Sequence, residues 1–391
     1  MKPKAVLAYS GGLDTSVCIP WLKEAGYSVI AFCADVGQEK DIRPARERAF
    51  LLGAEKVIVR DLRQPFASEY VLPALKAGAV YEGKYLLATA LSRPLIAREL
   101  GRVAQAHGAD TVAHGCTGKG NDQVRFEVTL RILNPRIRIV APVREWDLAS
   151  RQEEARYLQK RGLPVPKKSD SRYSIDQNLW GVSIESGPLE DPWVEPPSQA
   201  YRWTVDPARA PAKPQTVTID FKKGVPVQVD GKKAAPAELF RALNRIGSRH
   251  GVGRSDLVED RLVGIKSREI YEAPAATILH AAHRELEALT LDRETLAFKE
   301  GVSQRYARLV YDGLWFTPLK EALDRFVDSV QARVTGTVRM KLFRGTALCV
   351  GRKSPFSQYA KTLATYEGKD LFDQKAAGGF IQLFGLPYVK R

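Results

Sequence analysis

The segment SGGLDTS, residues 10–16, places three hydroxyl groups and one carboxylate around two glycines. It follows an apolar run at residues 6–9 and precedes a helical pattern, so it is predicted to turn from a buried strand into a helix. Glycines let the backbone approach a ligand closely, and the N–H groups at a helix N-terminus favour phosphate oxygens. We expect Asp14 to engage Mg²⁺ or to orient backbone donors. The alternative is a tight turn in which Ser10 and Asp14 only cap the helix.

A second polar segment, HGCTGKGNDQVRFE at residues 114–127, also stands between a predicted strand and a predicted helix. It is not a Walker A loop or a dinucleotide fingerprint, because Gly120 and Gln123 occupy the positions that decide those motifs. Neighbouring Asn and Asp suit an amine or ureido group, and the planar fork of Arg125 suits a carboxylate. The alternative is a polar loop with a capped helix.

Short apolar runs alternate with helical patterns through the first 165 residues. The strand candidates lie at 6–9, 29–33, 57–59, 111–113 and 137–140, and the helical patterns at 14–25, 44–52, 87–107, 122–133 and 149–161. Runs of this kind suit strands buried on both faces of a parallel sheet. We therefore predict an α/β fold that begins with a doubly wound parallel-sheet domain, residues 1–165.

Prolines mark the next stretch, residues 162–214, which we interpret as a long connector. Its aromatic residues Trp180, Trp193, Tyr201 and Trp203 are expected to pack against a domain. Strand patterns at 216–221 and 225–229, a hairpin at 336–350 and helical patterns at 237–246, 275–289 and 319–330 follow. They predict an α+β domain over residues 166–360, and residues 361–391 form a short C-terminal tail or arm.

Composition indicates a globular protein. The 391 residues are 44% hydrophobic and 27% charged, and no apolar run reaches the roughly 18 residues that a membrane span needs, so we expect neither export nor a membrane partner. Four widely spaced cysteines without a CxxC pair fit a reducing, cytoplasmic location. The formal charge of +15 would suit a polyanion, but no basic run exceeds two residues, so we expect a solvated basic surface and no nucleic-acid partner.

The residues of both polar segments match a known family. SGGLDTS resembles the pyrophosphate loop of the N-type ATP pyrophosphatases, and with GKGNDQVRFE at 118–127 the chain is similar to the argininosuccinate synthases. The likeness continues through YEGKYLL at 81–87, EDPW at 190–193, RHGVGRSDLVEDR at 249–261 and KSREIYEAP at 266–274, and it covers roughly residues 4–365. The first motif is shared with other ATP pyrophosphatases, whereas the second and RHGVGR are far more specific.

The resemblance implies an ATP-binding carbon–nitrogen ligase of arginine biosynthesis. The ureido oxygen of citrulline would attack the α-phosphorus of ATP and expel magnesium pyrophosphate, and the amine of aspartate would then displace AMP from the citrullyl-adenylate. Positioning and charge stabilisation dominate such displacements, so no protein nucleophile and no prosthetic group is expected. A cytoplasmic homotetramer is implied as well, although the C-terminal arm that helps the family's tetramers assemble is short here.

The resemblance also implies site residues, position by position. ATP would meet Ala8, Tyr9, Ser10, Gly11, Gly12, Leu13, Asp14, Thr15, Ser16, Ala34 and Gly115. Citrulline would meet Tyr85, Asn121, Arg125, Ser174, Ser183, Glu259 and Tyr271, and aspartate would meet Thr117, Asn121 and Asp122. Ser10, Asp14 and Asp122 would be catalytic, and Mg²⁺ would arrive with ATP without a site fixed by the protein alone. Arg125 and Glu259 could pair with the carboxylate and the ammonium of citrulline from different domains.

Three positions depart from the family pattern. Ala90 stands where a serine would touch citrulline, Glu269 replaces a glycine, and Ile184 replaces a tyrosine. Loss of a hydrogen bond to a charged group weakens binding by about 1.5–3 kcal/mol unless another group compensates. Thr89 and Ser92 are the hydroxyls near enough in sequence to do so.

Two other functions stay open at this stage. Thiouridine and lysidine synthases share the pyrophosphate loop, so an ATP-dependent RNA-modifying enzyme is one alternative, although Cys116 has no evident cysteine partner. A nucleotide-sensing module without catalysis is the other. His280 and His283 could present two metal ligands on one helix face, but without a third ligand a helix at a subunit or domain surface is the simpler interpretation.

Overall fold

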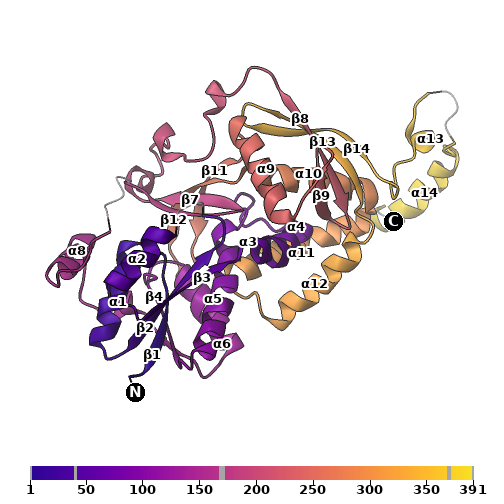
Figure 1. The fold of residues 1–391 in the computed structure, drawn as a ribbon. Helices are drawn as coiled ribbons and strands as arrows, with labels where there is room; N and C mark the ends of the chain where they lie inside the picture. Colours follow the sequence, from indigo (N-terminus) through magenta and orange to yellow (C-terminus); the bar gives the residue numbers. More distant parts are fainter. Residues whose placement is uncertain (1, 39–41, 167–171, 368–370, 390–391) are drawn as a thin grey trace.

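The computed structural model describes residues 2–38, 42–166, 172–367 and 371–389. The N-terminal part is built on a parallel sheet with the order β3-β2-β1-β4-β5 (Figure 1). Its strands are β1 (Lys4–Ala8), β2 (Ser28–Asp35), β3 (Lys56–Asp61), β4 (Thr111–His114) and β5 (Arg138–Val140). All five predicted strands are therefore present, each within a few residues of its expected bounds.

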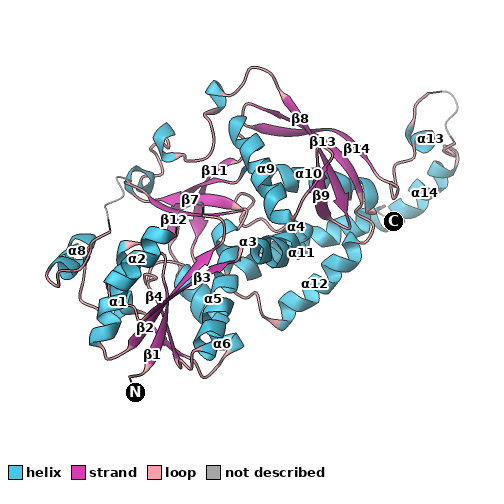
Figure 2. Cartoon of the chain, viewed as in Figure 1, coloured by secondary structure: helices cyan, strands magenta, loops and turns pink. Residues whose placement is uncertain are grey.

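Helices cover both faces of this sheet (Figure 2). They include α1 (Leu13–Glu24), α2 (Arg43–Leu51) and α8 (Arg151–Gln159) on one face, and α5 (Ala88–Ala106) and α6 (Asp122–Leu133) on the other. The alternation of side chains along β1 explains the two layers, because Ala5 and Leu7 join the core with α1 and α2 while Val6 joins the core with α5. The doubly wound arrangement predicted from the sequence is confirmed.

The strand order reverses direction between β1 and β4. From β1 the chain winds outwards to β2 and β3, and from β4 it winds the other way to β5. At such a switch point the loops beyond the carboxyl ends of the two central strands diverge and leave room for a ligand. The two loops here are residues 9–12 and 115–121, the two polar segments selected from the sequence.

The sequence patterns missed the helices between β3 and α5. The chain forms α3 (Arg63–Pro65), the π-helical segment η1 (Phe66–Val71) and α4 (Leu72–Ala77) in direct succession, and a short α7 (Pro142–Glu145) follows β5. Phe66 and Leu75 are fully buried, in the same core cluster as Phe240 and Tyr306 from the second half of the chain. One hydrophobic core thus runs through both halves.

A four-stranded antiparallel sheet follows, with the order β11-β12-β7-β6. Its strands are β6 (Ser174–Asn178), β7 (Gly181–Glu185), β11 (Arg254–Asp260) and β12 (Lys266–Glu272). Two of them lie inside the stretch interpreted as a connector, whose other segments are the 3₁₀ turns 187–190, 198–200 and 207–209. Trp180 is buried as expected, but the expectation for Trp193 is wrong, because its side chain is 94% exposed.

A second antiparallel sheet has the order β10-β9-β8-β13-β14. It comprises β8 (Gln215–Lys222), β9 (Val225–Val229), β10 (Lys232–Lys233), β13 (Gly336–Phe343) and β14 (Thr346–Lys353). The helices of this half are α9 (Pro236–Arg249), α10 (Pro274–Thr290), α11 (Arg293–Tyr311) and α12 (Pro318–Gln331). The hairpin predicted around Arg344-Gly345 is confirmed, whereas α11 was not predicted.

The histidine pair on α10 is part of the packed interior. His283 is buried and its Nε2 lies 2.8 Å from Gln331 Oε1 of α12. Burial lowers the pKa of His280 to about 3, so this side chain is neutral. Among the described residues no cluster of three or more potential metal ligands occurs. The pair is a packing feature, and the expectation of a surface-lying helix is wrong at His283.

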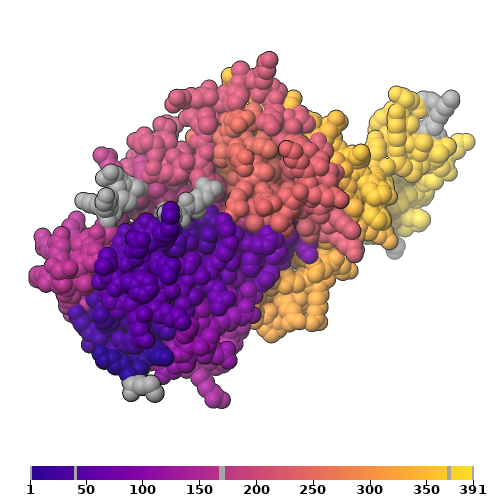
Figure 3. Space-filling view, in the orientation of Figure 1, coloured from indigo at the N-terminus to yellow at the C-terminus, as the bar shows by residue number. Residues whose placement is uncertain are grey.

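The C-terminal segment stands out from the body of the molecule (Figure 3). It contains α13 (Lys361–Ala364), α14 (Ala376–Gly385) and the turn η5 (Leu386–Tyr388). No residue of α14 is buried. Nowhere in the described ranges is a helix both long and apolar enough to cross a membrane.

Candidate active site

The loop between β1 and α1 has the geometry of an anion site. Gly11 has φ +77°, and a Cβ there would lie 2.8 Å from the Cβ of Ala45, so only glycine fits without a shift. The N-cap of α1 is Gly12, which has no side chain, and among the described residues only Ser10 Oγ bonds an N–H at this helix end, that of Gly12. The N–H groups that follow Gly12 therefore lack the partners that capping would supply. A cap by Asp14 is not formed, so that part of the alternative is wrong, whereas a cap by Ser10 stays open.

Hydroxyl groups hold the loop in shape. Ser10 Oγ accepts a hydrogen bond from the N–H of Gly12 at 3.3 Å and lies 3.1 Å from Thr15 Oγ1. The hydroxyl of Tyr9 lies 3.3 Å from Ser16 Oγ, and Arg48 of α2 donates to the carbonyl of Gly11 at 2.8 Å. These contacts fix the backbone in advance of any ligand.

A second carboxyl group stands beside Asp14. Glu154 of α8 is only 6% exposed and lies near enough to Asp14 for the two charges to interact. Burial, together with the negative charge of Asp14, raises the pKa of Glu154 to about 8. Its Oε2 is buried without a hydrogen-bond partner in the described structure. The sequence analysis did not select Glu154, because nothing within α8 marks it as different from a surface glutamate.

The loop after β4 approaches the first loop closely. A Cβ on Gly115 would lie 2.9 Å from Thr15 Cγ2, so the absence of a side chain lets the two loops meet. Gln123 of α6 donates to the carbonyls of Gly118 and Gly120 at 2.5 and 3.2 Å and holds the loop from inside. Thr117, at the crest, is exposed. The N-cap of α6 is Asn121 and makes no side-chain cap, so the alternative of a merely capped helix is wrong here too.

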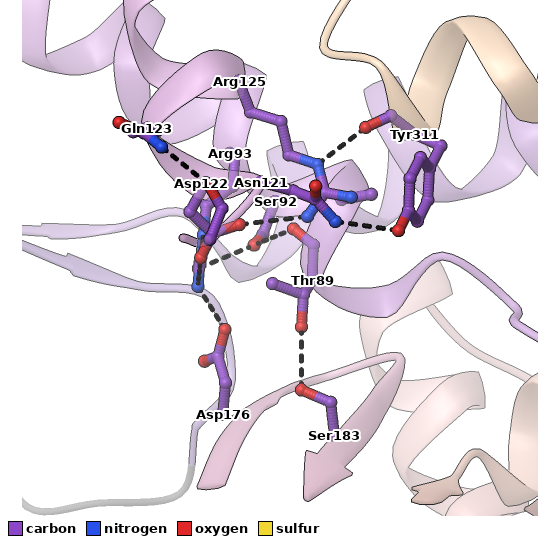
Figure 4. A network of polar contacts seen from close by, with 12 residues as sticks. Thr89, Ser92, Arg93, Asn121, Asp122, Gln123, Arg125, Asp176, Ser183 and Tyr311 are labelled. Carbon is purple, nitrogen blue, oxygen red and sulfur yellow. Dashed lines mark hydrogen bonds and ion pairs between the residues drawn. The ribbon is translucent and has the colours of Figure 1, made fainter. Parts of the chain in front are cut away.

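Asp122 lies between two arginines (Figure 4). Arg93 of α5 donates to Asp122 Oδ2 from Nε at 2.9 Å and from Nη2 at 2.7 Å, and it also pairs with Asp176 of β6. Arg125 Nη1 donates to Asp122 Oδ1 at 3.0 Å. Burial raises the pKa of Asp122, but the charges of the two arginines outweigh it and hold this pKa below its ordinary value. Arg93 was not singled out in the sequence, since its partners lie 29 and 83 residues away.

Arg125 keeps one donor free. Nε donates to the backbone carbonyl of Tyr311 at 2.8 Å, Nη1 binds Asp122, and Nη2 is buried with no partner in the part of the chain that the structure describes. A buried, unpaired N–H of a guanidinium is costly. By charge and geometry, this donor suits a carboxylate.

Glu259 of β11 receives two phenol hydroxyls. Tyr271 of β12 donates to its Oε2 at 2.5 Å and Tyr311 of α11 to its Oε1 at 2.7 Å. Burial raises the pKa of Glu259 above its ordinary value, against the opposing effect of the two hydroxyls and of Arg125. Arg125 and Glu259 thus lie on either side of Tyr311, one contacting its carbonyl and the other its hydroxyl.

The four-stranded sheet carries one expected citrulline residue on each strand. Ser174 begins β6, Ser183 lies on β7, Glu259 on β11 and Tyr271 on β12. Ser183 and Tyr271 are direct register partners, so their side chains share a face. The ring of Tyr85, from the first half of the chain, stacks on Tyr271 with centroids 4.4 Å apart. Tyr85 and Tyr271, which are 186 positions apart in the sequence, are therefore in contact.

The N-terminus of α5 closes the site near Tyr85. The hydroxyl of Tyr85 accepts hydrogen bonds from the N–H groups of Thr89 at 3.1 Å and Ala90 at 3.2 Å. The side chain of Ala90 is fully buried, and Thr89 Oγ1 lies 3.3 Å from Ser183 Oγ. Ser92 Oγ already donates to the carbonyl of Thr89 at 2.9 Å. Thr89 is therefore the hydroxyl placed next to an expected citrulline residue.

The turn that follows β11 is hydrogen-bonded to the loop 115–121. The N–H of Leu262 donates to Asn121 Oδ1 at 2.9 Å, and Arg261 donates to the carbonyl of Lys119 at 3.3 Å. Arg261 also pairs with Glu185 and Glu269. Burial, with the neighbouring charges of Glu259 and Glu185, raises the pKa of Glu269 to about 8. The atypical Glu269 is therefore paired with an arginine of the turn that follows β11.

Two family models match the chain almost end to end. The N-terminal HUP domain of arginosuccinate synthase matches residues 4–164, and the C-terminal domain of the same family matches residues 173–390. An argininosuccinate synthase from Carboxydothermus hydrogenoformans is 56% identical and covers 100% of this chain and 98% of its own. A protein of that name from Symbiobacterium thermophilum is 57% identical, and the alignment covers 99% of this chain and 96% of the relative. One from Geobacillus kaustophilus is 56% identical, with 98% of this chain and 95% of the relative covered.

Proposed function

Because the chain belongs to the argininosuccinate synthase family, we propose that the residues around the β1–β4 switch point bind ATP, citrulline and aspartate in three adjoining subsites. The enzyme is an ATP-using carbon–nitrogen ligase of arginine biosynthesis, which condenses citrulline with aspartate to give argininosuccinate, AMP and pyrophosphate. The observation that carries the proposed arrangement is the buried, unpaired Nη2 of Arg125, because a substrate carboxylate is the group that would satisfy it.

The ATP subsite comprises residues 8–16 together with Ala34 and Gly115. Ala34 is the second-last residue of β2, the strand that pairs with β1, and Gly115 allows the second loop to meet Thr15, so all of them lie at the carboxyl ends of the parallel strands. The N–H groups of the α1 N-terminus and the Ser10 hydroxyl would receive the leaving pyrophosphate as its charge develops. We propose Ser10 and Asp14 as the catalytic residues of this step.

Magnesium fits beside Asp14. Mg²⁺ binds carboxylate oxygens, and the buried Glu154 Oε2, which lacks a partner in the described structure, belongs to a carboxyl group whose charge interacts with that of Asp14. Asp14, with Glu154 next to it, would hold the ion, which neutralises phosphate charge when it is bound. This arrangement explains why two carboxyl groups meet at a site that otherwise attracts anions.

The metal assignment is tested by ion binding. Glu154→Gln and Asp14→Asn should each weaken the binding of Mn²⁺, used as a paramagnetic probe in the presence of pyrophosphate, by at least about tenfold. Glu47→Gln on the exposed side of α2 is the matched control and should leave binding unchanged. Wild-type Mn²⁺ affinity in Glu154→Gln would remove Glu154 from the site.

The citrulline subsite lies between Arg125 and Glu259. Arg125 Nη2 would pair with the carboxylate of citrulline and Glu259 with its ammonium group, while Tyr85, Tyr271 and the two serines of β6 and β7 line the remaining surface. Tyr85 and Tyr271 also border a small cavity of about 40 Å³. This binding mode leaves the ureido end of citrulline free to face the α-phosphorus of ATP.

The aspartate subsite is assigned to the loop 115–121 and the start of α6. Thr117 is exposed at the crest of the loop, and Asp122 lies at the first turn of α6. Asp122 is already paired with Arg93 and Arg125, so it would act together with Arg93, whose charge suits the carboxylates of aspartate. The amide of Asn121 is bonded on both sides, to Tyr311 and Leu262, and thus has a fixed orientation.

Pyrophosphate release tests the proposed order of steps. With ATP and citrulline alone, the protein should release about one pyrophosphate per active site, and AMP should appear only after aspartate is added. Ser10→Ala and Asp14→Asn should slow this burst by at least about tenfold while the fold persists. Pyrophosphate release that requires RNA and ignores citrulline would instead favour the RNA-modifying alternative.

Assembly and location complete the proposal. We propose a homotetramer in which the C-terminal segment packs on other subunits, supported by the exposed apolar residues of α14. A reducing cytoplasm is the proposed location, supported by four cysteines that are all free thiols.

A further inference from the structure

Tyr311, the last residue of α11, connects the two amino-acid subsites. Its side chain is 1% exposed, and its hydroxyl lies 2.8 Å from Asn121 Nδ2 and 2.7 Å from Glu259 Oε1. Asn121 follows the loop of the first half, whereas Glu259 belongs to the four-stranded sheet. Figure 4 shows Tyr311 beside Arg125 and Asn121, at the point where the two halves meet.

The chemistry of the three groups fixes the direction of these hydrogen bonds. An amide nitrogen can only donate, so the hydroxyl of Tyr311 accepts from Asn121. Its single proton then goes to Glu259, whose ionised carboxylate can only accept. The amide orientation agrees, because Asn121 Oδ1 accepts from the N–H of Leu262 at 2.9 Å. The result is a continuous chain of hydrogen bonds from Asn121 through Tyr311 to Glu259, which we call the relay.

We propose that Tyr311 is a positioning residue whose hydroxyl holds Asn121 and Glu259 in register, so that citrulline and aspartate are presented to each other in one geometry. The inference rests on the proposed assignment of the two subsites. Tyr311 touches no substrate in this scheme and acts through its two neighbours.

The remaining contacts of Tyr311 do not involve its hydroxyl. Its carbonyl accepts from Arg125 Nε at 2.8 Å, and its ring lies 4.8 Å from Arg125 Cζ. The ring of Tyr81 stacks on it with centroids 3.6 Å apart. Tyr311→Phe therefore removes the relay and keeps the packing, so this variant is expected to fold.

Tyr306→Phe is the matched control. Tyr306 lies on the same helix, is fully buried, and donates its hydroxyl to Asp324 Oδ1 of α12 at 2.8 Å. Both substitutions remove one buried phenol hydroxyl bonded to a carboxylate, and only one of them borders the proposed site. The unfolding temperatures of the two variants should be similar.

The steady-state constants separate positioning from stability. Tyr311→Phe should raise the KM for citrulline by roughly tenfold or more and the KM for aspartate to a smaller extent, since each subsite loses a fixed partner. The KM for ATP should stay within about twofold, and Tyr306→Phe should leave all three constants near wild type. Equal values in both variants, or a uniform rise that includes ATP, would overturn the proposal.

The pH profile gives an independent readout. Both tyrosine hydroxyls bond to the ionised form of Glu259 and so oppose the effect of burial on its pKa, as do the charges of Arg125 and Arg261. Glu269, Tyr81 and Tyr85 are its other titratable neighbours among the described residues. Loss of the Tyr311 hydroxyl raises the pKa of Glu259 further. Because the ammonium needs an ionised Glu259, the acid limb of kcat/KM for citrulline should move to higher pH in Tyr311→Phe and not in Tyr306→Phe.

A double-mutant cycle tests whether the hydroxyl acts through Glu259. If it does, adding Tyr311→Phe to Glu259→Gln should change the citrulline KM by much less than the same substitution does in the wild type. Additive effects would show that Tyr311 acts independently and would overturn the relay. A wild-type protein that releases no pyrophosphate with citrulline would instead contradict the proposed function, so the two failures are distinguishable.

Discussion

At the scale of single residues, Arg125 and its neighbours form a balanced cluster with one donor left over. Two arginines, Arg93 and Arg125, face two carboxylates, Asp122 and Asp176, so the cluster is neutral before substrate arrives. The unpaired Nη2 of Arg125 then offers a directed donor without an excess charge. An anionic substrate group gains a hydrogen bond from Nη2 here. Because the cluster has no net charge, the position of this donor matters more for binding than a general attraction between charges.

Removing this guanidinium should affect citrulline most. Arg125→Ala leaves the substrate carboxylate without a partner, and we expect a loss of about 2–5 kcal/mol in citrulline binding. Because Arg125 also binds Asp122, a smaller rise in the aspartate KM should accompany it. Arg125→Lys, which keeps the charge and loses the fork, should fall between wild type and Arg125→Ala. A larger effect on the aspartate KM than on the citrulline KM would reverse the two subsite assignments.

The missing serine at position 90 leads to a second residue-scale prediction. Thr89 Oγ1 lies beside Ser183, so we expect Thr89 to supply the hydroxyl that Ala90 lacks. Thr89→Val should then raise the citrulline KM by roughly tenfold or more, because a polar contact to the substrate is lost without a change in size. Thr89→Ser keeps the hydroxyl and should leave the citrulline KM near the wild-type value. Ala90→Ser should leave citrulline binding equal or tighter. Aspartate binding should not change in any of the three.

Residue type alone selected some residues of the proposed site and missed others. Arg125 was selected because its planar fork suits a carboxylate, whereas Glu259 was expected only from the family resemblance. Arg93, Glu154 and Tyr311 were missed, because their roles come from partners that are distant in sequence, such as Asn121, which is 190 residues from Tyr311. No local pattern encodes such a pairing.

At the scale of elements, predictability followed the hydrophobic pattern. The buried strands of the parallel sheet are short apolar runs, and all five were predicted. Strands β11 and β12 read RSDLVED and KSREIYE, and they were missed because polar side chains replace the apolar alternation on which such predictions depend. Two of those polar residues, Glu259 and Tyr271, belong to the proposed site, and residues chosen for function weaken the structural signal.

The first loop allows a prediction about an element as a whole. Gly11→Ala combines an unfavourable φ of +77° with a contact of 2.8 Å to Ala45 of α2, so the loop or the helix must shift. We expect the KM for ATP to rise by about tenfold or more, since phosphate donors are sensitive to small displacements. Gly26→Ala is the control, because its φ of +93° brings the same strain with no atom within 4 Å. Similar ATP constants in the two variants would show that the loop tolerates displacement.

At the scale of the whole molecule, the two halves are one structural unit and the C-terminal segment is not part of it. A single core cluster includes side chains of α4, α5, α9, α10 and α11, so the halves cannot separate without exposing apolar surface. The relay through Tyr311 and the bond from Leu262 to Asn121 join the halves at the site as well. The body therefore holds the residues of the proposed site in place, and the projecting segment contributes none of them.

That segment gives the last prediction. Gln358 is hydrogen-bonded to the body through Leu289 and Thr290. Beyond it, α14 exposes Phe380, Ile381, Leu383 and Phe384, each by more than 60%. An isolated ten-residue helix is marginal in water, so α14 needs an apolar partner, for which we propose another copy of the chain. Replacing Phe380, Leu383 and Phe384 together by serine should lower the molar mass measured by light scattering to that of a smaller oligomer. Replacing Lys375, next to the helix, by serine is the control and should not lower the molar mass. An unchanged mass in the triple variant would place the assembly contacts elsewhere on the body, for example on the open edge of β14, where Leu348 and Val350 are exposed.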